Sequence, residues 1–327
     1  MSLLPELLDA DGFRRALIAG RAPGATVWTA AAAAIAARHQ LAAAGSPAAS
    51  FTPAASGSSV VLLSPRHCVK LHAPDDTMRA ACATEVAALR RVEGALPVAT
   101  PAVIAAGELD GWPYFVATRV GGVAIDEVWP ALDPRARRRL AHAVGVAVAA
   151  LHAVRVDDLA IGPAWAELAA AQRRGCVARE RAGGLDDARV AELEALLVEG
   201  DRAPARRFRP ALLHTELGPG HVLVEPGADG AIAGPSGLID FGEAMIGDPE
   251  YDLAAVGLFV TRGDRAAFRA FGEGYGASAA ELDDPARPLR LLRHALLHRY
   301  GTLTWYLQRL EPPDVSLEDL GDFWFGT

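Results

Sequence analysis

The spacing of hydrophobic residues changes twice in the first third of the chain. Alanine-rich residues 28–43 have strong helix propensity and precede a Gly-Ser-Pro stop signal, so we expect a helix there and a loop over 44–58. Residues 77–93 return to the apolar spacing of a helix. Short apolar runs bounded by turn residues predict two β-hairpins around that helix. Their four strands are expected at residues 59–63, 68–72, 103–108 and 113–119.

After Gly121-Gly122 the pattern is mostly helical, with helices separated by glycine and proline residues. One apolar run, residues 236–241, interrupts this pattern and predicts a short strand. Helices are expected at residues 134–153, in two pieces within 163–199, and over 251–310 with breaks near 272–276 and 285–288.

These elements predict an α+β fold with two lobes. A small antiparallel-sheet lobe with one key helix precedes a larger, mostly helical lobe. We assign residues 1–118 to an N-terminal helical extension plus the sheet lobe, and residues 119–327 to the helical lobe. A length of 327 residues fits two such domains.

The composition excludes several classes of protein. With 51% apolar and 22% charged residues, the chain can form a core. Its net charge of −8 argues against nucleic acid as a partner. The three cysteines contain no C-x-x-C pair, so they do not support a disulfide framework or a cysteine zinc site. The N-terminus lacks a long apolar signal region and no run is long enough for a bilayer, so we expect a soluble, cytoplasmic protein with no membrane partner.

The stretch LLHTELGPGHVLV, residues 212–224, contains the clearest chemical signal. A histidine, a carboxylate two residues later and a polar residue five further on follow the H-x-D-x-x-x-x-N pattern of phosphoryl-transfer loops. Here these positions hold His214, Glu216 and His221. We expect His214 to hold the loop and Glu216 to act as the base toward a hydroxyl, with His221 at the position of the metal-binding asparagine.

Phosphoryl transfer from a nucleotide also needs a cation for the phosphates and carboxylates for Mg²⁺. Lys70 lies in an apolar strand, and Glu85 lies on the apolar stripe of the next helix, where it can pair with Lys70. Nineteen residues after His221, LIDFGEA places Asp240 after an apolar run, where a Mg²⁺ carboxylate is needed. A strand-edge lysine and a solvent-facing acid remain the ordinary alternatives for Lys70 and Glu85.

Three further segments match such a site by position. Ser56-Gly57-Ser58-Ser59 precedes the lysine strand, where a phosphate-covering turn belongs. Thr118, Arg119 and Val120 connect the lobes, and their backbone is expected to bind the adenine edge. In GDPEYDLA, Asp248 is a candidate helix N-cap, and Asp252 is placed to return a hydrogen bond to the 214–221 loop.

In this order the segments resemble the aminoglycoside phosphotransferases, small-molecule kinases with a protein-kinase-like fold. The resemblance covers roughly residues 50–327 and rests on CVKL, TEVAALRR, YFVATRVGG, VAALHAV, LLHTELGPGHVLV, LIDFGEA and GDPEYDLA. It implies ATP or GTP and Mg²⁺ as cofactors, with Lys70 on the α/β-phosphates, Glu85 orienting Lys70, Glu216 as base and Asp240 on the metal. PYFVATRVGG and LEDLGDFWFG look most like the hygromycin B kinase branch, which implies a cationic antibiotic as acceptor.

The chain departs from the family pattern at two positions. Glu216 replaces a shorter carboxylate, which moves the oxygens by about one C–C bond, ~1.5 Å. His221 replaces a hard oxygen ligand with an imidazole, although macrolide kinases also resemble this chain in carrying histidine there. In the family, acids of the helical lobe select cationic acceptors. Candidates here are Asp314, Glu318, Asp319 and Asp322, for which a solvated acidic tail is the alternative.

Other functions stay open at this point. A zinc hydrolase or deaminase would use His214, Glu216 and His221, but the P-C-x-x-C and H-E-x-x-H patterns are absent from the sequence. His294 and His298, four residues apart, fit an ordinary amphipathic helix better than a metal pair. A nucleotide-binding pseudokinase, or a kinase of a macrolide or nucleoside antibiotic, also fits. We expect a monomer or homodimer.

Overall fold

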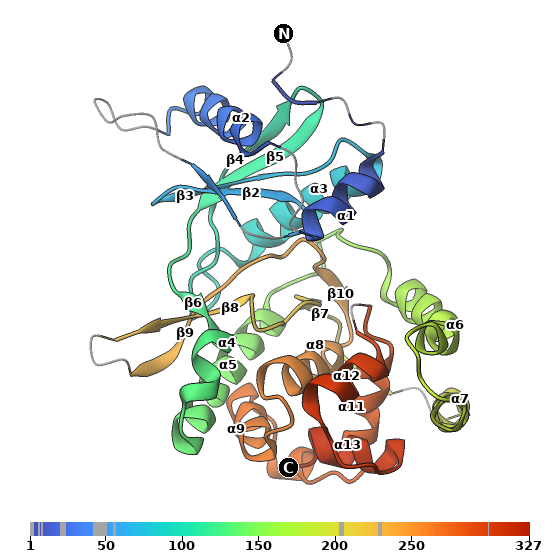
Figure 1. The fold of residues 1–327 in the computed structure, drawn as a ribbon. Coiled ribbons are helices and arrows are strands. Elements are labelled where there is room, and N and C mark those ends of the chain that lie inside the picture. The colour runs from blue at the N-terminus through green and yellow to red at the C-terminus, as the bar shows by residue number, and fades with distance from the viewer. Residues whose placement is uncertain are drawn as a thin grey trace. The chain divides into compact units, whose positions relative to one another are not determined.

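The computed structural model describes residues 3–5, 7, 9–19, 24–41, 51–54, 57–202, 206–227, 231–299 and 301–327. The chain forms two compact units (Figure 1). Unit 1 consists of Met1–Glu93 and Thr100–Val120, and unit 2 of Gly94–Ala99 and Gly121–Thr327. The predicted domain division after residue 118 stays a prediction.

Unit 1 is built on a five-stranded antiparallel sheet with the order β1-β2-β3-β5-β4. The two predicted hairpins are present as β2–β3 and β4–β5, with strand ends within one residue of those expected. The edge strand β1 lies in a segment predicted as a loop. The strands are β1 (Thr52–Pro53), β2 (Val60–Leu63), β3 (His67–Leu71), β4 (Val103–Leu109) and β5 (Trp112–Thr118).

Successive side chains of β3 point alternately into the apolar core and toward the opposite face of the sheet, which carries Lys70. Val69 and Leu71 are fully buried in an apolar cluster with residues of helices α1 (Ala10–Ile18) and α2 (Ala25–Arg38). Because successive strand residues point to opposite faces, Lys70 points away from that cluster. Helix α3 (Asp76–Val92), capped by Asp75, contributes Glu85 to the face that carries Lys70. The helix expected over 77–93 is thus confirmed, whereas α1 was not predicted.

Unit 2 is mostly helical, with two small sheets of order β6-β8-β9 and β10-β7. Its strands are β6 (Val123–Ala124), β7 (Ala211–Leu213), β8 (Val222–Pro226), β9 (Ile232–Leu238) and β10 (Met245–Gly247). Its helices are α4 (Ile125–Val128), η1 (Trp129–Ala131), α5 (Pro134–Ala153), α6 (Trp165–Ala182), α7 (Asp187–Arg202), α8 (Glu250–Ala255), η2 (Val256–Val260), α9 (Arg265–Tyr275), α10 (Ala279–Leu282), α11 (Arg287–Leu296), α12 (Leu303–Leu310) and α13 (Leu317–Phe325).

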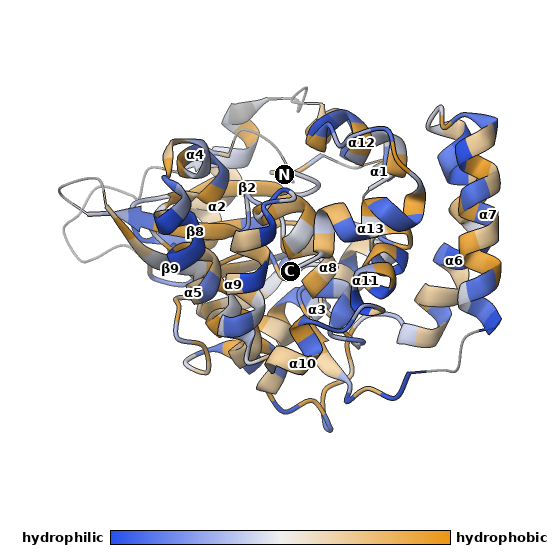
Figure 2. Cartoon of the chain, turned by 90° about the horizontal axis from the view of Figure 1, so that it is seen from below, coloured by the Kyte–Doolittle hydropathy of each residue, from blue (hydrophilic) through white to orange (hydrophobic). Residues whose placement is uncertain are grey.

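The centre of unit 2 depends on close packing of α5 against α9. A Cβ atom on Gly145 would lie 2.1 Å from the carbonyl oxygen of Phe271, and one on Gly274 would lie 2.0 Å from that of His142. Only glycine allows the two backbones this approach. Helices α11 and α13 carry both hydrophilic and hydrophobic residues (Figure 2), and hydrophobic ones such as Leu291, Leu292 and Leu320 are buried. This packing fixes α5, from which His152 reaches the candidate site.

The predicted α+β fold, with a small antiparallel sheet and a larger helical part, is confirmed. The strand expected at 236–241 begins earlier and ends at Leu238, so Asp240 follows β9 by two residues. None of the helices in the described part of the chain is both long and apolar enough to span a bilayer.

Candidate active site

A buried ion pair joins β3 and α3 in unit 1. The Nζ atom of Lys70 lies 2.8 Å from Oε2 and 3.0 Å from Oε1 of Glu85, and both side chains are almost fully buried. His72, the residue after β3, lies with Nε2 3.9 Å from that carboxylate and Nδ1 3.2 Å from Oγ of Ser59. The pairing predicted from the sequence is therefore present. The Lys70 ammonium is therefore held in a fixed position by the Glu85 carboxylate.

The predicted phosphate-covering turn is partly described, since Ser56 lies outside the described residues. Gly57 has φ +153, a value that disfavours a side chain. Ser58 is exposed, whereas Ser59 is buried with its hydroxyl on His72. Of the two hydroxyls, that of Ser58 is the more accessible to a ligand.

The connector residues already use part of their backbone. The Thr118 N–H donates to the Ala102 carbonyl at 2.9 Å, and the Arg119 N–H donates to the Arg66 carbonyl at 2.8 Å. The Thr118 hydroxyl in turn accepts from the Ala102 N–H. Two of the three N–H groups predicted for an adenine edge are therefore engaged. Val120, half-buried, follows them as the remaining candidate donor.

In unit 2 the 214–221 loop is anchored by a buried carboxylate. Asp252 of α8 is fully buried and accepts from the backbone N–H groups of His214 and Thr215, both at 2.8 Å. It also accepts from Nε2 of His152 at 3.1 Å. Burial alone would raise the pKa of Asp252, but the His152 hydrogen bond and neighbouring positive charge hold that pKa below its usual value. The predicted return bond from Asp252 to the loop is confirmed.

His214 connects the loop to the segment that carries Asp240. Its Nε2 donates to the Ile239 carbonyl at 2.9 Å, and its Nδ1 accepts from the Glu216 N–H at 3.3 Å. Burial, and then the neighbouring His221, lowers the pKa of His214 to about 4. The ring is therefore neutral at physiological pH and acts as a fixed bridge between residues 216 and 239.

Two residues of this region have unusual backbone conformations. Thr215 has φ +67 and Asp240 has φ +66, both in the left-handed region. For a β-branched residue such as Thr215 this is a strained conformation, which costs about 1–3 kcal/mol and persists only where its surroundings enforce it. Such strain is concentrated at functional sites, which agrees with the assignment of both segments to one site.

His221 and Asp240 form the candidate metal site. The His221 Nδ1–H donates to the Glu216 carbonyl at 2.7 Å, so the lone pair of the neutral ring is on Nε2. That Nε2 lies 3.7 Å from Oδ2 of Asp240, and both side chains are partly exposed. Mg²⁺ ligands at right angles, with bonds of about 2.1 Å, lie about 3.0 Å apart, so a small approach brings both atoms onto one ion. The donor set fits a divalent cation, and imidazole favours a softer ion than Mg²⁺.

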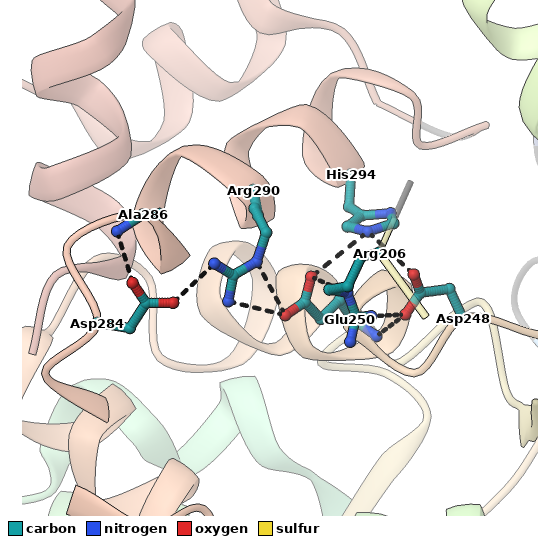
Figure 3. Close-up of polar contacts among 7 residues, drawn as sticks. All are labelled: Arg206, Asp248, Glu250, Asp284, Ala286, Arg290 and His294. Atoms are coloured by element: carbon teal, nitrogen blue, oxygen red, sulfur yellow. Dashed lines mark hydrogen bonds and ion pairs between the residues drawn. The ribbon is translucent and has the colours of Figure 1, made fainter. Parts of the chain in front are cut away.

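A second group of ligand-type side chains in unit 2 does not fit a metal (Figure 3). Nε2 of His294 lies 3.7 Å from Asp248 and 3.8 Å from Glu250. Both carboxylates, however, bind Arg206, and Glu250 also binds Arg290 at 3.4 Å. A metal ion at this position would have to displace an arginine. The charges of Asp248 and Glu250 are already paired with Arg206 and Arg290, so we assign these residues a structural role. They give no support to the metal hydrolase reading.

Two sequence interpretations need correction or refinement. Pro249 stands at the N-cap position of α8, but it has helical φ and ψ and makes no side-chain capping bond. The Asp248 side chain instead accepts from the Glu250 N–H at 3.0 Å. Among the C-terminal acids, Asp314 pairs with Arg189 at 2.7 Å. Asp319 accepts a hydrogen bond from the Ser316 hydroxyl, and all four acids, Glu318 and Asp322 included, are exposed.

Sequence reasoning missed two contacts that hold the site. His152 binds Asp252, and His298 donates from Nε2 to the Thr215 carbonyl at 2.9 Å. Both partners lie far away in sequence, and no local pattern distinguishes these histidines from ordinary helix-face residues. His298 in fact follows α11 by two residues, so it does not share a helix face with His294.

Comparison with known proteins shows the family and the fold of this chain. The model of the phosphotransferase enzyme family matches residues 50–289. The solved GDP complex of wild-type aminoglycoside 2'-phosphotransferase-IIIa is similar at 19% identity with a TM-score of 0.63, over 83% of this chain and 92% of that one. Aminoglycoside phosphotransferase APH(3'')-Id from Streptomyces rimosus is similar at 20% identity with a TM-score of 0.58, over 83% of this chain and 98% of that one. These similarities show a kinase-like fold in common.

Proposed function

Since this chain belongs to the phosphotransferase enzyme family, we propose that it transfers the γ-phosphate of ATP or GTP to a hydroxyl of a small cationic antibiotic. The acceptor class we favour is the aminoglycosides, with hygromycin B as the first member to test. The proposal is supported above all by one observation in unit 2. The 214–221 loop presents Glu216 between two anchors, His214 and His221, that tie it to the segment of Asp240.

Glu216 is assigned the role of general base. Its backbone N–H is held by Nδ1 of His214 and its carbonyl by Nδ1 of His221, so both peptide groups next to its Cα are fixed. Because the backbone is fixed, the extra methylene of Glu216, compared with aspartate, displaces the carboxylate oxygens in a defined direction. An acceptor hydroxyl displaced in the same direction would still contact them. In the proposed reaction the acceptor hydroxyl gives its proton to Glu216 as its oxygen bonds to phosphorus and the bond to the nucleotide diphosphate breaks.

The nucleotide phosphates and base are assigned to residues of unit 1. Lys70, oriented by Glu85, would bind the phosphates, with the Gly57–Ser59 turn beside it and the connector backbone at the base. The engaged N–H groups of Thr118 and Arg119 leave the Val120 backbone as the best candidate for the adenine edge. Similar solved structures contain GDP, ADP or ATP, which supports either an adenine or a guanine nucleotide as the phosphate donor.

The metal is assigned to Asp240 and His221. A bound Mg²⁺ would supply positive charge to the phosphates during transfer. Mg²⁺ binds nitrogen less readily than oxygen, so the imidazole of His221 would weaken Mg²⁺ binding. This favours a second candidate function, a nucleotide-binding pseudokinase with little turnover.

A cationic acceptor agrees with two features. The chain has a net charge of −8, and Glu318 and Asp322 of α13 are exposed. The solved relatives include complexes with kanamycin, streptomycin and gentamicin, all of them aminoglycosides. Macrolides and nucleoside antibiotics are the alternative acceptors.

The decisive experiment is a nucleotide-turnover screen with ATP and GTP across aminoglycosides, macrolides and nucleoside antibiotics. We expect turnover with an aminoglycoside, its loss in Asp240→Ala, and a fall in kcat of at least ~10²-fold in Glu216→Gln. Turnover in the Asp240→Ala variant would mean that the metal site is misassigned. Nucleotide binding without turnover of any acceptor would favour the pseudokinase, and the absence of both would refute the proposal.

A further inference from the structure

We propose that His298 is a positioning residue for Glu216, acting through the peptide bond between Thr215 and Glu216. This inference rests on the proposed function, because it gives Glu216 the role that the peptide serves. His298 touches neither nucleotide nor acceptor in this proposal. Its Nε2 donates to the Thr215 carbonyl at 2.9 Å.

Three consecutive peptide groups of the loop are held by buried side chains. Asp252 accepts from the N–H groups of His214 and Thr215. The third group, between Thr215 and Glu216, is held at both ends. His214 accepts from its N–H at 3.3 Å, and His298 donates to its carbonyl at 2.9 Å. Rotation of that peptide would reorient Glu216, so the two imidazoles together define the direction of its side chain.

The backbone of Thr215 explains why such a restraint is needed. Its φ of +67 is strained for a β-branched residue, and a rotation of the following peptide is a route by which the loop can relax. Asp252 fixes only the groups before this peptide. The Thr215 hydroxyl adds a bond to the Glu243 carbonyl at 3.0 Å, but it does not restrain the Thr215 carbonyl. His298 supplies that missing restraint.

His298 is itself rigidly placed. It is 2% exposed, and its ring stacks on Tyr251 with 4.8 Å between centroids and 15° between planes. Phe259 packs against its edge at 5.5 Å. The next residue, Arg299, forms an ion pair with Glu243 and donates its N–H to the Tyr251 hydroxyl. The segment after α11 is thus anchored independently of the loop, as a positioning element must be.

The test compares two matched pairs of variants in the full chain. His298→Leu removes the donor at similar volume, whereas His298→Gln places an amide N–H near the former Nε2. His298→Asn is polar but shorter by one methylene, so it should not reach Thr215. His294→Leu, on the preceding turn and in contact with Asp248 and Glu250, is the control for loss of a buried histidine from this region.

For His298→Leu and His298→Asn we expect kcat to fall by about 10- to 100-fold, on the scale of a misplacement of ~1 Å, with the KM for nucleotide and acceptor changed less than about threefold. His298→Gln should recover most of kcat. His294→Leu should lower thermal stability with kcat near the wild-type value. Equal kcat losses in His298→Leu, His298→Gln and His294→Leu would overturn the proposal, because they would show a merely structural role.

Amide hydrogen exchange over residues 211–221 gives a readout that does not depend on turnover. We expect faster exchange in His298→Asn and His298→Leu and near wild-type exchange in His298→Gln. Unchanged exchange in all three would overturn the positioning role. If the wild-type protein phosphorylates no acceptor, the proposed function fails, and the exchange data still decide whether His298 holds the loop.

Discussion

Two buried histidines should make the protein lose stability as the pH falls from 7 to 5. Burial, and after it the neighbouring His221, lowers the pKa of His214 to about 4, and burial lowers the pKa of His298 to about 4. In the unfolded chain both would titrate near their ordinary value of about 6.5. Between pH 4 and 6.5 the unfolded state therefore binds more protons than the folded state. Stability rises with pH through this window and levels off above it.

The magnitude follows from the size of the pKa shift. A depression of about 2.5 pH units at about 1.4 kcal/mol per unit makes each histidine worth about 3.4 kcal/mol between full protonation and full deprotonation. The part that falls between pH 7 and pH 5 is about 2 kcal/mol per histidine, or about 4 kcal/mol for the pair. This is a large fraction of a typical folding free energy of about 5–15 kcal/mol.

Denaturant unfolding at several pH values, for the wild type and His298→Gln, isolates one of these contributions. Glutamine does not titrate, and the other ionisable groups are the same in both proteins. We expect the wild type to lose about 2 kcal/mol more than the variant between pH 7 and pH 5. The same pH dependence in both proteins would refute the inference that His298 is buried in its neutral form.

Three further outcomes test other parts of the structure. Glu85→Gln should raise the KM for nucleotide by about tenfold, because it frees the Lys70 ammonium from the carboxylate 2.8 Å away. Steady-state kinetics at varied ATP concentration would detect this increase. An unchanged KM would contradict the role assigned to Glu85. His221→Asn should shift the metal preference of turnover from Mn²⁺ toward Mg²⁺, because it exchanges a nitrogen ligand for an oxygen ligand. The ratio of the turnover rates with the two metal ions measures this shift. An unchanged ratio would show that His221 is not part of the metal site. Arg206→Ala should let Zn²⁺ raise the melting temperature by more than it does in the wild type, because the carboxylates and imidazole that Arg206 now balances become free to bind the ion. Scanning fluorimetry of both proteins would detect this, and an equal effect of Zn²⁺ on both would contradict it.

Local patterns predicted the parts of the site that depend on local geometry. The alternation of β3 gave the direction of Lys70, and the helical stripe gave Glu85, because strand and helix periods fix which side chains share a face. Asp252 was predicted only from its place in GDPEYDLA after the 214–221 loop, because its hydrogen bonds to His214 and Thr215 span 38 and 37 positions. Asp248, the predicted cap, lies one residue before the N-cap position, which Pro249 occupies, and its carboxylate still accepts the Glu250 N–H.

The rest of the site depends on contacts between distant parts of the chain. His298 and Thr215 meet although 83 positions separate them, and His152 meets Asp252 across 100 positions. The strained φ of Thr215 likewise has no signal in its residue type, because threonine rarely adopts that conformation and only tertiary bonds enforce it. The ion pairs of Arg206 and Arg290 with Asp248 and Glu250 could not be predicted from the sequence either, because these residues are also far apart in the chain.

The central claim is that Glu216 accepts a hydroxyl proton as phosphate passes to an aminoglycoside. Mass spectrometry of hygromycin B and other aminoglycosides after incubation with ATP, Mg²⁺ and the protein tests it most directly. We predict an acceptor that gains one phosphoryl group with the wild type, and at least ~10² times more slowly with Glu216→Gln. Equal phosphorylation by both proteins, or no phosphorylated acceptor with the wild type, would contradict the claim.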